Sequence, residues 1–94
     1  MFAIHQTDDG TIHLSGRLDG HEAAGAQEAF AAFPAGARVD LSELEYISSA
    51  GISVLLHAWK RAEQAGATFR VVRMSPAVRT VLRYAGLEQV LTGS

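Results

Sequence analysis

The chain contains 94 residues, of which 48% are apolar and 19% charged, and its formal net charge is −2. This length predicts one domain, spanning residues 1–94, with a single modest core. The apolar content excludes intrinsic disorder as the default state, and the weak negative charge disfavours nonspecific nucleic-acid binding. Because cysteine is absent, disulfides and thiol chemistry are excluded, a composition compatible with a reducing compartment.

No apolar run approaches the roughly 20 residues needed to cross a bilayer, and the N-terminal residues lack the pattern of a signal peptide. We therefore expect a cytoplasmic protein with no direct membrane insertion. The charges are uneven, because residues 1–49 hold eight acidic and two basic side chains and residues 50–94 hold two acidic and six basic ones. Two explanations stand: oppositely charged faces of one domain, or a protein-binding surface with complementary charge on the partner.

The first predicted unit is a hairpin. Residues 2–7 and 12–18 alternate between apolar and polar side chains, and Asp8-Asp9-Gly10 between them is a turn signal. We expect the two runs to pair as antiparallel strands. Residues 21–33 are rich in alanine and predict a short helix, which the following Pro34-Ala35-Gly36 ends.

The middle of the chain predicts a strand followed by a strongly amphipathic helix. Residues 38–41 form a short strand with little apolar content, and Asp40 is expected near its end. The helix after Ser49 ends at Gly66. Its apolar positions recur at helical spacing and predict one continuous core stripe. That stripe comprises Ile52, Leu55, Leu56, Trp59 and Ala62.

The last third predicts a strand at residues 68–73, rich in β-branched side chains. Ser75 is expected to cap a final helix with Pro76 at its first position, and residues 87–91 either pack back as a tail or form a last turn. The strand–helix alternation after residue 38 indicates βαβ units. The predicted fold is therefore a single small α/β domain with a mixed four-stranded sheet, a fifth strand being left open, and helices mainly on one side.

Tyr46-Ile47-Ser48-Ser49-Ala50-Gly51-Ile52 places two hydroxyls where a loop becomes a helix. A helix N-terminus offers unpaired N–H groups and a partial positive charge, so a serine there can act as a cap or can carry a phosphate. For Ser49 both interpretations stand. Ser48 is interpreted as a cap or a solvated hydroxyl, with a second phosphoacceptor as the alternative. Asp40 either stabilises the turn at Ser42 and Glu43 or binds a partner.

The same stretch resembles the signature of the STAS domain of bacterial anti-sigma-factor antagonists. Asp40-Leu41-Ser42 before Tyr46–Ile52 is similar to the family's strand and phosphoacceptor turn, and Gly16-Arg17-Leu18-Asp19 is similar to the end of an early strand. Residues 76–87 resemble its closing helix and turn. The resemblance covers residues 2–90, and it matches Ser49 to the phosphoacceptor. One position departs from the pattern, because Ser48 stands where the family usually has aspartate.

The resemblance implies a non-enzymatic, phosphorylation-controlled protein-binding module in a partner-switching circuit. Its partner would be an anti-sigma factor with GHKL-type serine kinase activity, and a PP2C-type phosphatase would reverse the modification. The implied binding edge is the connection from Asp40 to Ile52 with the first turns of the next helix. Its expected contacts are Asp40, Ser42, Ser48, Ser49, Ala50, Gly51, Ser53 and His57.

Other functions are weighed against this one. A STAS domain can also be a constitutive subunit docked on the ATPase of a lipid-transport ABC system, and the serine at position 48 favours that alternative slightly. A small-ligand-binding domain has no specific support. The four histidines show no metal-ligand spacing, and Ser49 lacks the nucleophile elbow and the nearby base of a hydrolase. No phosphate-binding glycine loop is present, so no metal, cofactor or catalytic residue is expected.

Overall fold

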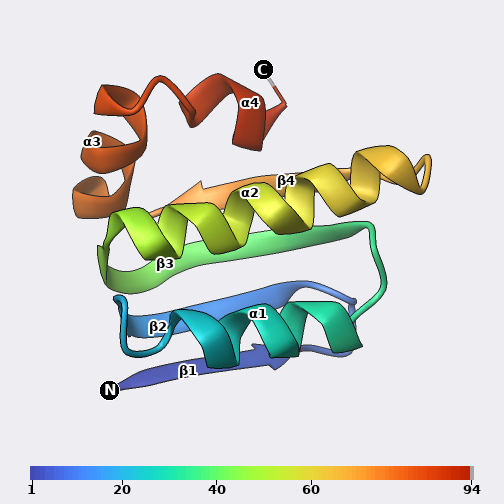
Figure 1. Ribbon diagram of the computed structural model, residues 1–94, viewed down its shortest axis with the longest axis horizontal. Helices are drawn as coiled ribbons and strands as arrows, with labels where there is room; N and C mark the ends of the chain where they lie inside the picture. Colours follow the sequence, from blue (N-terminus) through green and yellow to red (C-terminus); the bar gives the residue numbers. More distant parts are fainter. Residues whose placement is uncertain (94) are drawn as a thin grey trace.

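The computed structural model describes residues 1–93 and contains, within them, one mixed α/β domain of four strands and four helices (Figure 1). In chain order these are β1 (Phe2–Gln6), β2 (Ile12–Leu18), α1 (Ala23–Ala32), β3 (Ala37–Ile47), α2 (Ser49–Gln64), β4 (Phe69–Met74), α3 (Pro76–Tyr84) and α4 (Glu88–Thr92).

The strands form one sheet in the order β1-β2-β3-β4. β1 and β2 pair antiparallel, as predicted from the hairpin pattern, and Gly10 supplies the positive φ (87°) that their turn requires. β2, β3 and β4 are mutually parallel. Their connections run through α1 and α2, which lie side by side on the same face of the sheet (Figure 1). The predicted fold class is confirmed.

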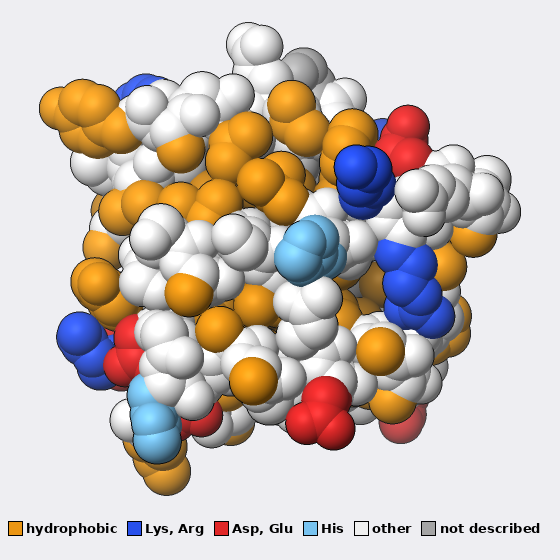
Figure 2. All heavy atoms as spheres, in the orientation of Figure 1, with side chains coloured by type: hydrophobic (Ala, Val, Ile, Leu, Met, Phe, Trp, Pro, Cys, Tyr) orange, Lys and Arg blue, Asp and Glu red, His pale blue; other side chains and the backbone are white. Residues whose placement is uncertain are grey.

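The core lies between the sheet and these helices. On β2, β3 and β4, alternate apolar side chains such as Ile12, Leu14, Val39 and Val71 are almost fully buried, because the helices cover that face. The opposite face of the sheet carries polar and charged side chains. Apolar side chains also gather on the helical surface where α3 and α4 lie beside α2 (Figure 2).

The prediction for β3 was too short: the strand runs eleven residues to Ile47, whereas the sequence predicted residues 38–41. Its pairing contains register shifts, one of them between Val39 and Asp40, and further ones lie opposite β2. Each shift breaks the two-residue alternation of a regular strand. Leu44 and Ile47 are buried at a spacing of three, so the segment does not show the pattern of a strand.

The apolar stripe of α2 is also displaced from its predicted position. Leu55 and Ala62 are buried as expected, whereas Val54 and Ala58 join them and Ile52, Leu56 and Trp59 are only half-buried. The cause is α1, which packs along α2 and covers Val54 and Ala58. A second apolar neighbour widens the buried face in a way that one helix's periodicity cannot show.

The C-terminal region follows the prediction closely. The Ser75 hydroxyl accepts a hydrogen bond from the Val78 backbone N–H and donates one to the Leu44 carbonyl (2.6 Å). It therefore caps α3 and ties it to β3. The tail after Gly86 forms the short helix α4, whose Leu91 is fully buried.

Candidate functional site

The candidate site lies where the parallel strands end and the helices begin. The carboxyl ends of β2, β3 and β4 all lie at this end of the sheet, which is at the left of Figure 1. A hydrogen bond from the Ser48 N–H to the Leu18 carbonyl (2.9 Å) joins the first two strand ends. Ligands of open α/β sheets bind preferentially outside the carboxyl ends of the parallel strands.

The two serines at the start of α2 have different roles. Ser48 is the N-cap: its backbone is extended and its hydroxyl accepts a hydrogen bond from the Gly51 N–H (3.3 Å). Ser49 is the first helical residue, its side chain is exposed, and its hydroxyl forms no hydrogen bond with any residue among 1–93. The interpretation of Ser49 as the cap is therefore wrong, whereas the cap interpretation of Ser48 is confirmed.

The difference between the serines predicts different effects on stability. Ser48→Ala should lower the free energy of unfolding by about 1 kcal/mol, because a capping hydrogen bond is lost. Ser49→Ala should change it by less than about 0.5 kcal/mol, the usual range for an exposed side chain without partners. Urea unfolding followed by circular dichroism measures both variants, and equal losses would contradict the assignment.

Ser49 occupies a favourable place for a negative group. The first turn of α2 contains no acidic side chain, and the helix dipole and the first backbone N–H groups favour an anion there. The Ser48 hydroxyl occupies only the Gly51 N–H. A phosphate on Ser49 would therefore meet free donors at the N-terminus of the helix, at little cost to the fold itself.

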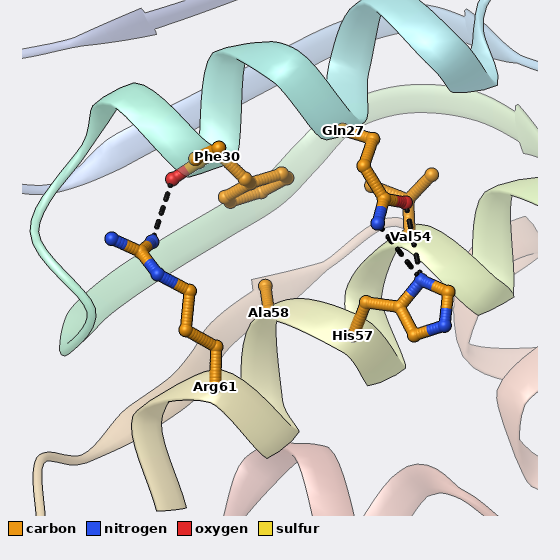
Figure 3. Close-up of a pocket in the computed structure, with 7 residues that line it drawn as sticks. Gln27, Phe30, Val54, His57, Ala58 and Arg61 are labelled. Atoms are coloured by element: carbon orange, nitrogen blue, oxygen red, sulfur yellow. Dashed lines mark hydrogen bonds between the residues drawn. The ribbon is translucent and has the colours of Figure 1, made fainter. Parts of the chain in front are cut away.

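The structure divides the other predicted contacts on α2 into two groups. Ser53 and His57 are exposed, and His57 Nδ1 lies 3.0 Å from the Gln27 side-chain nitrogen and 3.2 Å from its oxygen, across the groove between α1 and α2 (Figure 3). Ala50 is half-buried and Gly51 is buried. Gly51 was expected as a partner contact, but it is covered by Leu18 of β2 and Ile47 of β3, so a partner's backbone has no room to reach it.

The same end of the sheet holds two contacts that were not predicted from the sequence. The Asp19 carboxylate accepts hydrogen bonds from the backbone N–H groups of His21 and Glu22 (3.0 and 3.1 Å) and so orders the entry to α1. The Arg17 guanidinium lies 4.3 Å from the centre of the Tyr46 ring. The signal for the first contact was an aspartate placed just before a predicted helix, whereas the second depends on the parallel pairing of Arg17 with Tyr46.

Asp40 lies apart from the serines. It is paired with His13 and Arg73 within the sheet and is largely buried on the face away from the helices. It is therefore not at a strand end, and eight residues, or about 26 Å of extended strand at about 3.3 Å per residue, separate it from Ser48. Its carboxylate accepts a hydrogen bond from the Ser42 N–H (2.8 Å), which confirms the interpretation of Asp40 as a group that stabilises the backbone at Ser42.

The environment of Asp40 predicts a pH effect. Burial raises the pKa of this carboxyl, but hydrogen bonds from Ser42 and the charges of His13 and Arg73 outweigh burial and leave the pKa below its usual value. A lowered pKa stabilises the fold above the unfolded value of about 3.9, and this contribution is lost as pH falls through the folded pKa. Asp40→Asn should therefore destabilise the protein at pH 7, and the difference from wild type should shrink below about pH 4 in pH-dependent urea titrations.

Residues 1–93 contain neither a metal-ligand cluster nor a membrane-spanning helix. No three histidine, cysteine, aspartate or glutamate side chains come close enough to hold a metal ion. His5 and His13 stack across the hairpin, with ring centres 5.3 Å apart. Within the same residues, no helix has the length and hydropathy needed to span a bilayer.

The chain matches a known domain family over nearly its whole length. The family described as "Mlab, STAS domain" matches residues 2–92. The chain belongs to the STAS domain family. A search of curated proteins gave no significant match.

Solved structures share the STAS fold over nearly the whole chain. An anti-sigma factor antagonist from Mycobacterium paratuberculosis is 25% identical, with a TM-score of 0.78 over 97% of this chain and 81% of its own. A proposed anti-sigma factor antagonist from Thermotoga maritima is 20% identical, with a TM-score of 0.78 over 97% and 83%. The Bacillus cell fate determinant SpoIIAA in its phosphorylated form is 16% identical, with a TM-score of 0.71 over 98% and 88%.

Proposed function

We propose that this STAS domain is a bacterial anti-sigma-factor antagonist whose binding to an anti-sigma factor is controlled by phosphorylation of Ser49. The observation that carries the proposal is the exposed Ser49 hydroxyl, which is free for modification because Ser48 supplies the cap of α2. Support also comes from the similar structures, which include SpoIIAA in an unphosphorylated and a phosphorylated form.

The switch follows from the charge that phosphorylation adds. The anti-sigma factor would itself be a serine kinase with a GHKL-type ATP site, and the Ser49 oxygen would take the γ-phosphoryl group of ATP while ADP leaves. Neutral Ser49 allows close docking around the start of α2. Phosphoserine adds about −1.5 to −2 charges, which are tolerated at the helix N-terminus but costly to desolvate in an interface. The complex then dissociates, and a PP2C-type phosphatase restores it by hydrolysis.

The proposed binding surface follows the exposed side of α2. Ser49, Ser53 and His57 lie at intervals of four residues and therefore share one side of the helix. All three side chains are exposed. Buried Gly51 contributes by shaping the turn, and Ala50 lies at its margin. Asp40 and Ser42 belong to a different part of the sheet, so their proposed role is support of β3.

Mass spectrometry of the intact protein and its fragments tests the proposal after incubation with ATP and a lysate of the native host. The expected result is one added phosphoryl group on Ser49 in wild type and in Ser53→Ala, and none in Ser49→Ala. Ser53 is the matched control, since it is an exposed serine one turn further along α2. Modification of Ser48 or Ser53 instead, or no modification while a control kinase substrate is labelled, would overturn it. Lack of modification would favour constitutive docking of the domain.

A further inference from the structure

The two edges of the sheet are protected differently. β4, at one edge, carries Arg70 and Arg73, whose charges oppose pairing with another strand, and it packs against α4. β1, at the other edge, reads Phe-Ala-Ile-His-Gln and contains no Lys, Arg, Asp, Glu or Pro. Natural sheets usually blunt an exposed edge with such residues. The missing protection marks β1, which runs along the outer border of the sheet (Figure 1), as an edge that can pair.

The backbone of β1 shows which groups are available. The Thr7 N–H donates to the Thr11 carbonyl and the Arg17 N–H donates to the Met1 carbonyl, each at 2.9 Å. These two bonds fix the alternation of the antiparallel ladder, so the odd-numbered residues of β1 face β2. The N–H and C=O groups of Phe2, Ile4 and Gln6 therefore point away from the sheet. Within residues 1–93 they have no backbone partner.

We propose that β1 pairs antiparallel with β1 of a second copy of this chain, with Ile4 opposite Ile4 on the two-fold axis. In this register Phe2 of each copy lies opposite Gln6 of the other. All three outward-facing residues then exchange hydrogen bonds, six in total, whereas shifted registers leave some of these groups unpaired. The contact is isologous, since the same surface serves both copies, and it joins the two sheets into one of eight strands.

The side chains fit this arrangement. Phe2 and Ile4 are half-buried and pack against the core on the helix-covered side, so pairing brings the apolar margins of the two cores together across the axis. On the other face Ala3 lies opposite His5 of the second copy, and no like charges oppose each other. A charged segment of another protein would find no complementary side chain on β1, whereas a second copy presents the same uncharged strand, with the outward N–H and C=O groups of Phe2, Ile4 and Gln6 in matching positions.

The expected dimer is weak, because a pair of five-residue strands buries little surface. Sedimentation velocity of the full chain from about 10 µM to about 1 mM covers the affinities expected of a small interface. Wild type should show a concentration-dependent monomer–dimer equilibrium. A wild-type protein that stays monomeric over that range would overturn the proposal.

Substitutions at the two-fold axis test the register. Ile4→Lys and Ile4→Glu each place two like charges opposite each other, and each should weaken dimerisation at least tenfold while circular dichroism confirms the fold. Mixing the two variants should restore a dimer, because lysine then faces glutamate. Val72→Lys, on the exposed surface of the other edge strand β4, is the matched control and should dimerise like wild type. A dimer of Ile4→Lys alone as tight as wild type, or no dimer in the mixture, would overturn the proposed pairing.

Discussion

Gly51→Ala should lower the free energy of unfolding by about 2–3 kcal/mol, the upper part of the range for an overpacked core. A Cβ atom at this position would lie 2.6 Å from the Leu18 carbonyl oxygen and 2.8 Å from side-chain atoms of Leu18 and Ile47. The carbonyl cannot move freely, because it accepts the Ser48 N–H that joins the ends of β2 and β3. Relief would therefore require the first turn of α2 to lift from the sheet.

Gly25→Ala is the matched control, since it makes the same chemical change inside a helix. Gly25 lies in α1 and an added Cβ would meet nothing within 4 Å. This variant should gain about 0.5–1 kcal/mol, because alanine loses less backbone entropy than glycine in a helix. Urea unfolding at equilibrium, with the m-values compared, measures both changes. A Gly51→Ala protein as stable as Gly25→Ala would contradict the close packing of α2 on the sheet.

Local patterns predicted the elements whose signals lie within a few residues. The hairpin followed from alternation around Asp8-Asp9-Gly10, and the α3 cap followed from Ser75-Pro76. In each case one turn or one cap determines the structure, so neighbouring residues carry the information. The order of strands and helices then determined the fold class, because parallel strands require crossover connections.

The predictions failed where residues distant in the sequence determine the local structure. β3 is longer than predicted because bulges disturb its alternation, and bulges depend on the partner strand. Gly51 was expected to contact a partner, but Leu18, thirty-three positions earlier in the chain, packs against it instead. The sequence placed Ser48 and Ser49 at a helix start without deciding which of them caps it. A shift of one residue in the helix boundary exchanges the cap and the proposed phosphoacceptor, and local propensity does not resolve boundaries that finely.

Ser49→Asp should weaken binding to the proposed anti-sigma factor at least 100-fold, about 2.8 kcal/mol at 1.4 kcal/mol per tenfold. A carboxylate at Ser49 imitates part of the charge of a phosphate and must be desolvated when the start of α2 enters an interface. The same substitution should raise the free energy of unfolding by about 0.5 kcal/mol, because the charge lies at the positive end of the helix dipole. Binding and stability should therefore change in opposite directions, which separates the switch from simple misfolding.

Isothermal titration calorimetry with the purified anti-sigma factor measures the affinity, and urea unfolding measures the stability. Ser53→Asp is the matched control, since it places the same charge on an exposed serine one turn along α2. Its effect on affinity should be smaller, because it lies further from the helix N-terminus around which docking is proposed. Equal losses for Ser49→Asp and Ser53→Asp would show that any negative charge on this side of α2 repels the partner. Unchanged binding of Ser49→Asp would remove the basis for a phosphorylation switch at this position, because the added charge would then not lie in the interface.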